Sequence, residues 1–336
     1  MHSLTSMLKY RRRQHSDTQK DFCVRFLHPI FGKPDKAGNY VKIIGKNPSV
    51  CFTSHHDTVH RQEGLQKIQV INDVISLAPN SGSSCLGADC TTGIWLQLEM
   101  IEAGIEGVYV VHAAEEIGCI GSKALVDRNP RWLRHVKAVI SFDRKGDSEI
   151  ITHQSGYRTA SDAFAQSLAQ ILQLDLEASP NGSYTDSNVY RHKVSECTNL
   201  AVGYYGQHTK NETQDLKYLM KLRDALLSAD WSKLVFERDP NKVEFAIEEV
   251  WDYGYSYPFR ATSSSAYGAR DAGYYDVGLW EDNMDDDLEL IQEIALDGWE
   301  MLMPMLQDYF GTPEVLIEEL QRYGYKPDIN RILNRR

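Results

Sequence analysis

Three histidines and an aspartate follow a short apolar run near residue 55 of this 336-residue chain. The run "SVCF" has the composition of a buried strand, and the segment "SHHDTVH" (residues 54–60) continues it. His55 and Asp57 are two residues apart, so an extended backbone places both side chains on one face. An imidazole and a carboxylate are costly to bury unless they are paired or bind something. The segment therefore indicates either a metal site or a strand end with hydrogen-bonded polar residues.

Further acids and a histidine also follow apolar runs along the chain. Asp89 lies in the glycine-flanked turn "LGADCTTG", and Glu115 and Glu116 are adjacent in "VHAAEEIGCIGS". Asp143 ends the run "VISFD", and His208 lies in "GYYGQHTKNE". Taken singly, Asp89 has the features of an ordinary helix N-cap, and two adjacent glutamates are common in exposed turns.

These residues are interpreted together because they share a predicted position after strands. A parallel sheet brings the carboxyl ends of its strands to one rim, where the working residues of α/β proteins gather. Several acids converging there would form a strongly anionic pocket unless cations occupied it. Two histidines and three carboxylates suit two ions of the Zn²⁺ type that share one bridging carboxylate.

Strands and helices alternate from residue 16 to residue 230. Apolar runs predict strands in the segments "GNYVKIIG", "SVCFTS", "GVYVVHAA", "VKAVISFD" and "NLAVGYYG". Helical spacing or capping predicts helices in "SDTQKDFCVRFL", "IWLQLEMIEAG", "SKALVDRN", residues 159–174 and residues 214–229. This alternation predicts an α/β fold whose central sheet is mostly parallel and has helices on both faces.

The character of the sequence changes after Trp231. Residues 253–275 are rich in Tyr, Gly and Ser, and later segments have apolar residues at helical spacing. We therefore predict a catalytic domain over residues 1–231 and a mainly helical extension over residues 232–336. The extension is expected to pack on the catalytic domain or a second subunit, with a partner-binding module as the alternative.

Together, the motifs resemble those of the dinuclear zinc exopeptidases. The motifs are, in order, "SHHDTV", "LGADCTTG", "AAEEIGCIGS", "SFDRKG" and "GQHT". The resemblance covers about residues 16–230. This group of exopeptidases includes zinc aminopeptidases, tripeptidase-like enzymes and glutamate carboxypeptidases. The gaps between motifs are too short for the extra domain that some relatives insert. The chain is therefore most similar to the compact, lid-less zinc aminopeptidases.

The resemblance implies five metal ligands. His55 and Asp143 would bind one ion, Glu116 and His208 would bind the other, and Asp89 would bridge both.

It also implies roles beside the ligands. Asp57 would orient His55, and Glu115 would be the general base. Many relatives have a second aspartate where this chain has Cys90, but that position is not a ligand, and relatives commonly have a cis peptide bond just before it. His56 and His60 have no place in the pattern and are interpreted as neighbours of the ligands or residues of the pocket rim.

The segment "NGSYTDSNVY" resembles the substrate-side loop of the compact aminopeptidases. Asp186, Tyr184 and Tyr190 are its candidates for substrate contact or oxyanion support. An ordinary Asn-Gly turn is the alternative interpretation.

The expected enzyme is a dinuclear metal-dependent exopeptidase, namely an aminopeptidase that cleaves short peptides. Its two ions are expected to be Zn²⁺, with Co²⁺ or Mn²⁺ as alternatives. An N-acyl or C-terminal amide hydrolase with the same site is a second interpretation, and a non-catalytic binding protein with a peptidase fold is a third. The complete ligand set weighs against the third. A homo-oligomer is compatible with each.

Composition indicates where such an enzyme works. The net charge of −11 argues against a nucleic-acid partner, because phosphate binding needs clustered Lys and Arg. No apolar stretch approaches the roughly 20 residues of a membrane span, and residues 1–20 lack the apolar segment of a secretory signal. The six cysteines follow no zinc-finger spacing and are expected to be reduced. We therefore expect a cytoplasmic protein with no membrane partner.

Overall fold

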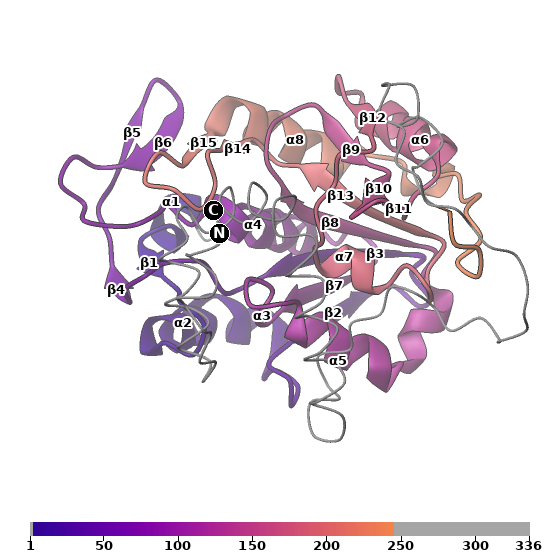
Figure 1. Ribbon diagram of the computed structural model, residues 1–336, viewed down its shortest axis with the longest axis horizontal. Helices are drawn as coiled ribbons and strands as arrows, with labels where there is room; N and C mark the ends of the chain where they lie inside the picture. The colour runs from indigo at the N-terminus through magenta and orange to yellow at the C-terminus, as the bar shows by residue number, and fades with distance from the viewer. Residues whose placement is uncertain (1–2, 245–336) are drawn as a thin grey trace, which may run out of the picture. The chain divides into compact units, whose positions relative to one another are not determined.

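The computed structural model describes residues 3–244 of the chain (Figure 1). The predicted extension lies outside the described residues, apart from residues 232–244. Among the described residues, no helix has the length and apolar character needed to cross a membrane.

A seven-stranded sheet lies at the centre of the described domain (Figure 1). In spatial order its strands are β12 (Glu177–Ser179), β9 (Glu149–Ile151), β13 (Glu196–Ala201), β8 (Ala138–Arg144), β3 (Val50–His55), β7 (Gly107–His112) and β2 (Tyr40–Ile44). The four strands from β13 to β7 run parallel to one another. Only the contacts of β2 with β7 and of β9 with β13 are antiparallel. The predicted mostly parallel sheet is confirmed.

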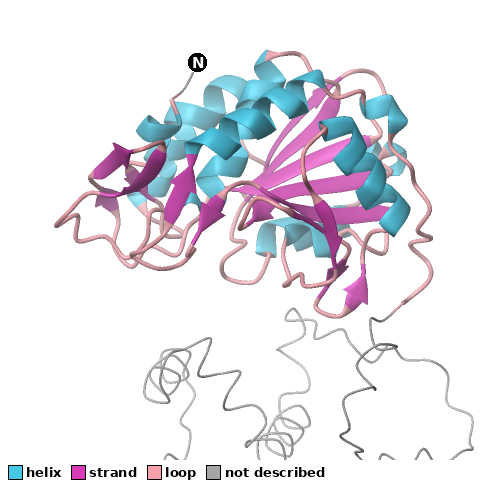
Figure 2. Cartoon of the chain, turned by 90° about the horizontal axis from the view of Figure 1, so that it is seen from above, coloured by secondary structure: helices cyan, strands magenta, loops and turns pink. Residues whose placement is uncertain are grey.

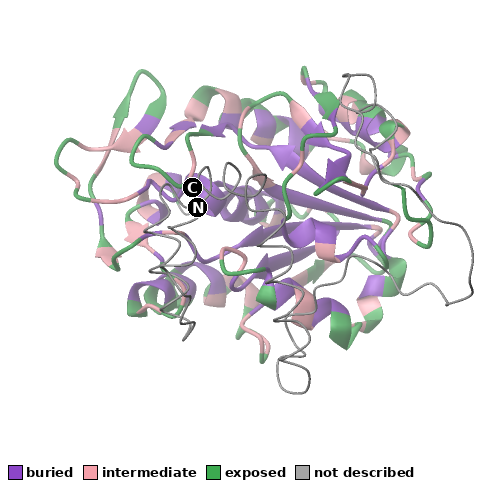
Figure 3. Ribbon diagram, viewed as in Figure 1, coloured by how far each residue is buried: buried purple, intermediate pink, exposed green. Residues whose placement is uncertain are grey.

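Helices cover both faces of this sheet (Figure 2). Alternate residues of a strand point to opposite faces, and Phe52 and Tyr109 face one hydrophobic cluster while Cys51 and Val108 face another. The first cluster contains side chains of α4 (Ala88–Glu102), α6 (Asp162–Leu172) and α8 (Leu216–Ser228). The second contains side chains of α5 (Ile120–Arg128). The central strands are consequently buried along their length (Figure 3).

Smaller elements surround this core. The other helices of residues 3–244 are α1 (Leu4–Met7), α2 (Asp17–Phe22), a π-helical turn (Cys23–Leu27), α3 (His28–Phe31), α7 (Asp186–Val189) and two 3₁₀ turns (Arg131–His135 and Trp231–Lys233). A second, antiparallel sheet has the order β14 (Tyr204–Tyr205), β15 (Thr213–Asp215), β6 (Val74–Leu77) and β5 (Ile68–Ile71). Two short ribbons pair β1 (Tyr10–Arg11) with β4 (Gly64–Leu65) and β10 (His153–Gln154) with β11 (Tyr157–Arg158).

The helix boundaries follow from local chemistry. Ser16 caps α2 as predicted, because its side chain accepts a hydrogen bond from the Gln19 backbone N–H. Asp215 caps α8 in the same way by accepting from the Tyr218 N–H. After α4, Gly104 takes a left-handed backbone conformation with φ of 73°, which glycine adopts readily.

Residues 234–244 run along the catalytic body, and we call them the strap. Leu234 is buried in the first hydrophobic cluster. The buried carboxylate of Glu196 accepts hydrogen bonds from the backbone N–H groups of Glu237 and Arg238. The Arg238 guanidinium in turn donates to backbone carbonyls of residues 191–195. The strap is therefore tied to the body by polar and apolar contacts.

Candidate active site

Side chains from five segments meet where the central strands end. His55 is the last residue of β3, Asp143 lies near the end of β8, and Asp89 is at the start of α4. Glu116 follows β7, and His208 follows β14. The pairing of β3 with both β7 and β8 brings the ends of these strands side by side.

Asp89 lies between the two histidines and turns a different oxygen toward each. His55 Nε2 is 3.1 Å from Asp89 Oδ1, and His208 Nε2 is 3.1 Å from Asp89 Oδ2. Each histidine also contacts one further acid. Asp143 Oδ1 is 3.3 Å from His55 Nε2, and Glu116 Oε2 is 3.3 Å from His208 Nε2. Two sets of three donors therefore share one carboxylate.

The spacing of these donors fits small divalent ions. Tetrahedral Zn²⁺ with bonds of about 2.0–2.2 Å holds neighbouring ligand atoms about 3.3–3.6 Å apart. The nitrogen–oxygen distances in both sets are 3.1–3.3 Å. Donor atoms of His55, Asp89 and Glu116 also lie within 4.8 Å of one another, so the two sets are adjacent. Nitrogen and carboxylate oxygen are both ordinary ligands of zinc.

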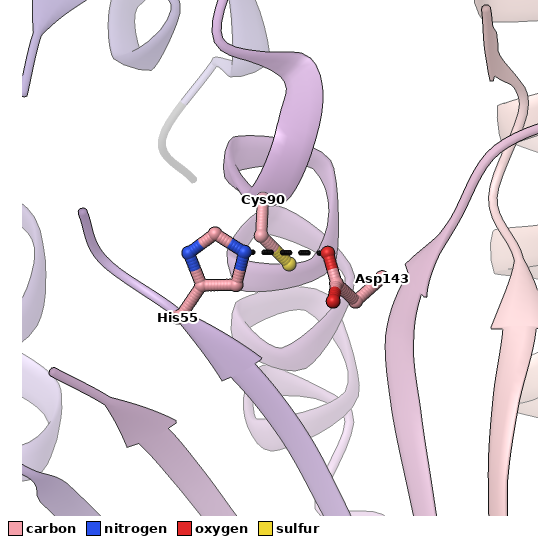
Figure 4. Close-up of side chains that lie close together, drawn as sticks. All are labelled: His55, Cys90 and Asp143. Atoms are coloured by element: carbon pink, nitrogen blue, oxygen red, sulfur yellow. Dashed lines mark hydrogen bonds and ion pairs between the residues drawn. The ribbon is translucent and has the colours of Figure 1, made fainter. Parts of the chain in front are cut away.

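Cys90 is close to the first set but has a different partner. Figure 4 shows its sulfur beside His55 and Asp143, and all three donor atoms lie within 4.8 Å of one another. The Cys90 thiol donates to the carbonyl oxygen of Phe142 at 3.1 Å. Burial raises the pKa of this thiol well above its usual range, which favours the neutral thiol that donates this hydrogen bond. We therefore leave Cys90 out of both donor sets. The Asp89–Cys90 peptide bond is cis, as the resemblance implied.

Asp57 connects the end of β3 to the pair of glutamates. Its carboxylate Oδ1 lies 3.5 Å from Nδ1 of His55, which also lies 3.1 Å from the Asp57 carbonyl oxygen. The two carboxylate oxygens accept the backbone N–H groups of Glu115 and Glu116, each at 3.1 Å. Asp57 can therefore orient the ring of His55 and fix the turn that carries both glutamates.

Burial governs the charge of the site, since it disfavours each ionised carboxylate there. Burial and the charge of Asp143 raise the pKa of Glu115 well above its usual range. Burial and the charge of Asp89 raise the pKa of Glu116 to about 7 and that of Asp143 to about 6. For His208, burial opposes protonation, but Asp89 and Glu116 outweigh it and raise the pKa to about 11. Acids whose pKa is raised in this way bind protons more readily near neutral pH, and positive charge nearby would favour their ionised forms.

The three predicted substrate residues lie in different surroundings. Asp186 is buried, and its carboxylate has no hydrogen-bond partner of normal geometry within residues 3–244, although the Ser122 hydroxyl lies beside it. Tyr184 is 42% exposed and lies under the Lys123 ammonium. Tyr190 is fully buried, and its hydroxyl lies 3.0 Å from His112 Nε2. The position of Tyr190 in the core does not support a substrate contact.

His56 and His60 have partners away from the ligands. The ring of His56 lies between the Gln19 amide and the Gly38 carbonyl oxygen. His60 lies between the Thr58 hydroxyl and the Gln66 side chain. Burial lowers the pKa of each to about 4, so both rings are neutral at physiological pH. They support the chain next to the site and belong to neither donor set.

Sequence reasoning did not single out two residues that hold Asp143. The Thr185 hydroxyl donates to Asp143 Oδ2 at 2.6 Å. Asn199 accepts the Asp143 N–H at 3.0 Å and donates to its carbonyl oxygen at 2.8 Å. Thr185 precedes Asp186 in the segment already singled out, and Asn199 is a polar residue inside the fully buried strand β13. A polar residue at such a position was the available signal.

The chain is similar to known proteins in both sequence and fold. The family model described as "Peptidase family M28" matches residues 39–215. Aminopeptidase PepT from Bacillus cereus has a similar structure, with 16% identity and a TM-score of 0.54 over 67% of this chain and 95% of that chain. A tripeptidase from Staphylococcus aureus has 15% identity and a TM-score of 0.54 over 67% and 95% of the two chains.

A third similar structure is the TET1 peptidase of Pyrococcus horikoshii, with 16% identity and a TM-score of 0.51 over 68% of this chain and all of that chain. No curated protein sequence matches the chain. At these identities the solved structures support the fold alone. The family match spans more than half of the chain and includes both donor sets. The chain therefore belongs to peptidase family M28 and is a metal-dependent peptidase.

Proposed function

We propose that this enzyme removes amino-terminal residues from short peptides and uses two divalent metal ions. Zn²⁺ is the metal that we favour. The observation that carries the proposal is the position of Asp89, which turns one carboxylate oxygen toward each histidine. A single ion would need only one of these contacts. In this proposal His55, Asp89 and Asp143 hold the first ion, and Asp89, Glu116 and His208 hold the second.

When bound, such ions polarise the scissile carbonyl and lower the pKa of an attacking water toward neutrality. In the chain itself, Glu115 accepts the proton of that water and passes it to the departing amine. Glu115 is suited to this role because its side chain belongs to neither donor set. Asp57 holds the backbone N–H groups of Glu115 and Glu116, which keeps the base next to the ligands.

Asp186 supports cleavage at the amino end. Its buried carboxylate lies close enough to Glu115 and Asp143 to influence their charge. Since neither of its oxygens has a hydrogen-bond partner of normal geometry in the described part of the chain, it has acceptor capacity for a cation. We propose that it binds the free α-ammonium of the peptide. Two of the similar structures are named as an aminopeptidase and a tripeptidase, which agrees with this choice.

A substrate comparison tests this proposal. The purified enzyme, loaded with Zn²⁺, is given a tripeptide, its N-acetylated form and its C-terminal amide, and products are followed by mass spectrometry. We expect release of the first residue from the free tripeptide and its amide, and no cleavage of the N-acetylated form. Faster cleavage of the N-acetylated peptide would instead indicate an N-acyl hydrolase. An inactive protein that still binds both ions would favour a non-catalytic role.

Assembly and location are also part of the proposal. The TET1 peptidase is described as assembling into a tetrahedron or a large octahedral shell, and we propose that this chain forms a homo-oligomer. Its six cysteines are buried and free, which supports a reducing, cytoplasmic setting. Light scattering on the purified protein and localisation of the tagged protein test these two points.

A further inference from the structure

Glu212 is a buried acid that belongs to neither donor set. It is 1% exposed and lies four residues after His208 in the chain. Its Oε2 atom accepts the backbone N–H groups of Leu86 and Gly87, each at 2.9 Å. Its Oε1 atom accepts the N–H of Asp89 at 3.1 Å. One carboxylate therefore holds three N–H groups of the turn that carries the shared ligand.

The turn that carries Asp89 has little room for other conformations. Gly87 has a left-handed backbone with φ of 74°, and an added Cβ would lie 2.7 Å from the ring of His60. The Thr91 hydroxyl donates a hydrogen bond to the Gly87 carbonyl oxygen. The same hydroxyl accepts a hydrogen bond from the Arg12 guanidinium. The turn is thus held at its end by Arg12 and at its start by Glu212.

The loop that carries His208 and leads to Glu212 is also held by hydrogen bonds. The Thr209 hydroxyl donates to the Gly206 carbonyl oxygen at 2.7 Å, and the Glu212 N–H donates to the Thr209 carbonyl oxygen at 3.1 Å. His208 lies within this loop and contacts Asp89 and Glu116. Glu212 consequently links the loop that carries His208 to the turn that carries Asp89, the residue that both donor sets share.

We propose that Glu212 is a positioning residue that sets the carboxylate of Asp89 between the two metal ions, and that it controls the affinity of both sites together. This inference rests on the proposed two-ion function. The backbone N–H of Asp89 is fixed by Glu212, so a shift there moves both carboxylate oxygens at once. A change at Glu116, by contrast, removes a donor from one set only.

Glu212→Gln is the informative variant. Glutamine keeps the shape of the side chain, but one of its two oxygens becomes an NH₂ group, which cannot accept from a backbone N–H. At least one N–H of the turn then loses its acceptor inside the protein. Glu212→Asp keeps the charge and withdraws it by one methylene, so it serves as a second variant. Glu102→Gln makes the same chemical change at an exposed position of α4 and is the matched control.

The experiment measures metal binding by the metal-free, full-length protein. Each variant is titrated with Co²⁺, and the two binding events are followed by visible absorption and calorimetry. Changes to residues that hold metal ligands in place typically cost about 10–100-fold in affinity. We expect Glu212→Gln to weaken both events by at least about tenfold, Glu116→Gln to weaken one, and Glu102→Gln to weaken neither. Saturating metal is expected to restore most of the activity of Glu212→Gln with little change in peptide KM.

The inference is overturned if Glu212→Gln weakens only one event, or if it leaves both affinities unchanged. A circular-dichroism melting curve without metal identifies a variant that does not fold, and Glu212→Asp then decides by the same criterion. The proposed function has its own control, because it fails if the wild-type protein binds fewer than two ions. If the wild type binds two ions and cleaves peptides, the proposed function stands whatever Glu212→Gln does.

Discussion

At the scale of single residues, the proposed mechanism assigns different roles to two adjacent glutamates. Glu116 contacts His208 and belongs to a donor set, whereas Glu115 has its backbone fixed by Asp57 and its carboxylate outside both sets. In this proposal Glu116 binds an ion while Glu115 stays available for proton transfer.

We predict that Glu115→Gln keeps the metal content of the wild type and lowers kcat by at least about 10²-fold, the usual scale for loss of a general base. Glu116→Gln is expected to lose metal as well as activity. Elemental analysis and peptide assays on the same preparations distinguish the two effects. Full activity in both variants would rule out the assigned roles.

Thr185 gives a second prediction at this scale. Its hydroxyl donates to the Asp143 oxygen that does not face His55. Thr185→Val keeps the shape and removes the donor, so affinity for the first ion is expected to fall by about 10–100-fold. Ser183→Ala, in an exposed position of the same loop, is the control. Equal Zn²⁺ affinity in both variants would show that Asp143 does not depend on Thr185.

The residues that sequence motifs identified and those they missed differ in a physical way. His55, Glu116 and Asp143 lie at or near the ends of the paired strands β3, β7 and β8, and this pairing brings their positions together. Asp89 and His208 were found through the motifs around them. Thr185, Asn199 and Glu212 act through hydrogen bonds to residues 42 to 126 positions away, which leave no spacing pattern. The substrate contact predicted for Tyr190 stays a prediction, and the burial of its side chain in the core could not be read from the surrounding sequence.

At the scale of elements, periodicity predicted the central strands and the long helices, while short pairings were missed. The hairpin of β5 and β6 turns at Asn72 and Asp73, both with positive φ. Asn and Asp tolerate that conformation, so "INDVI" was an available turn signal. Helix α7 has only four residues and is too short to show helical periodicity.

The strap gives a prediction about elements. Arg238 donates to several backbone carbonyls of residues 191–195 and has its own N–H bound by Glu196. Arg238→Met leaves those buried carbonyls without a donor, at about 1–3 kcal/mol for each group left unsatisfied. We expect a lower Tm than for wild type, measured by calorimetry. Lys242→Met, at an exposed position of the strap, is expected to leave Tm unchanged. Equal values for the two variants would contradict a stabilising strap.

At the scale of the whole molecule, both donor sets lie within residues 55–208, well inside the described part of the chain. Trp231 packs on Phe52 with ring centroids 4.9 Å apart, and Leu234 joins the main cluster. Residues just beyond the predicted boundary at 231 thus contact the catalytic body, while the rest of the extension lies outside the described residues.

This placement predicts the effect of shortening the chain. A protein ending at residue 244 retains the strap and is expected to fold and bind two ions, because no candidate ligand is removed. A protein ending at residue 228 lacks Trp231, Leu234 and Arg238 and is expected to unfold at a lower temperature. Melting curves and metal analysis of both shortened proteins check this. Equal Tm values for the two shortened proteins would refute this prediction, and so would loss of metal from the protein that ends at residue 244.

The central claim is that Asp89 joins two metal ions, and anomalous diffraction at the zinc absorption edge tests it most directly. Crystals of the Zn²⁺-loaded enzyme are expected to show two zinc peaks about 3.5–4 Å apart. One carboxylate oxygen of Asp89 should ligate each ion, with His55 on one and His208 on the other. A single peak, or two peaks that do not share Asp89, would contradict the account.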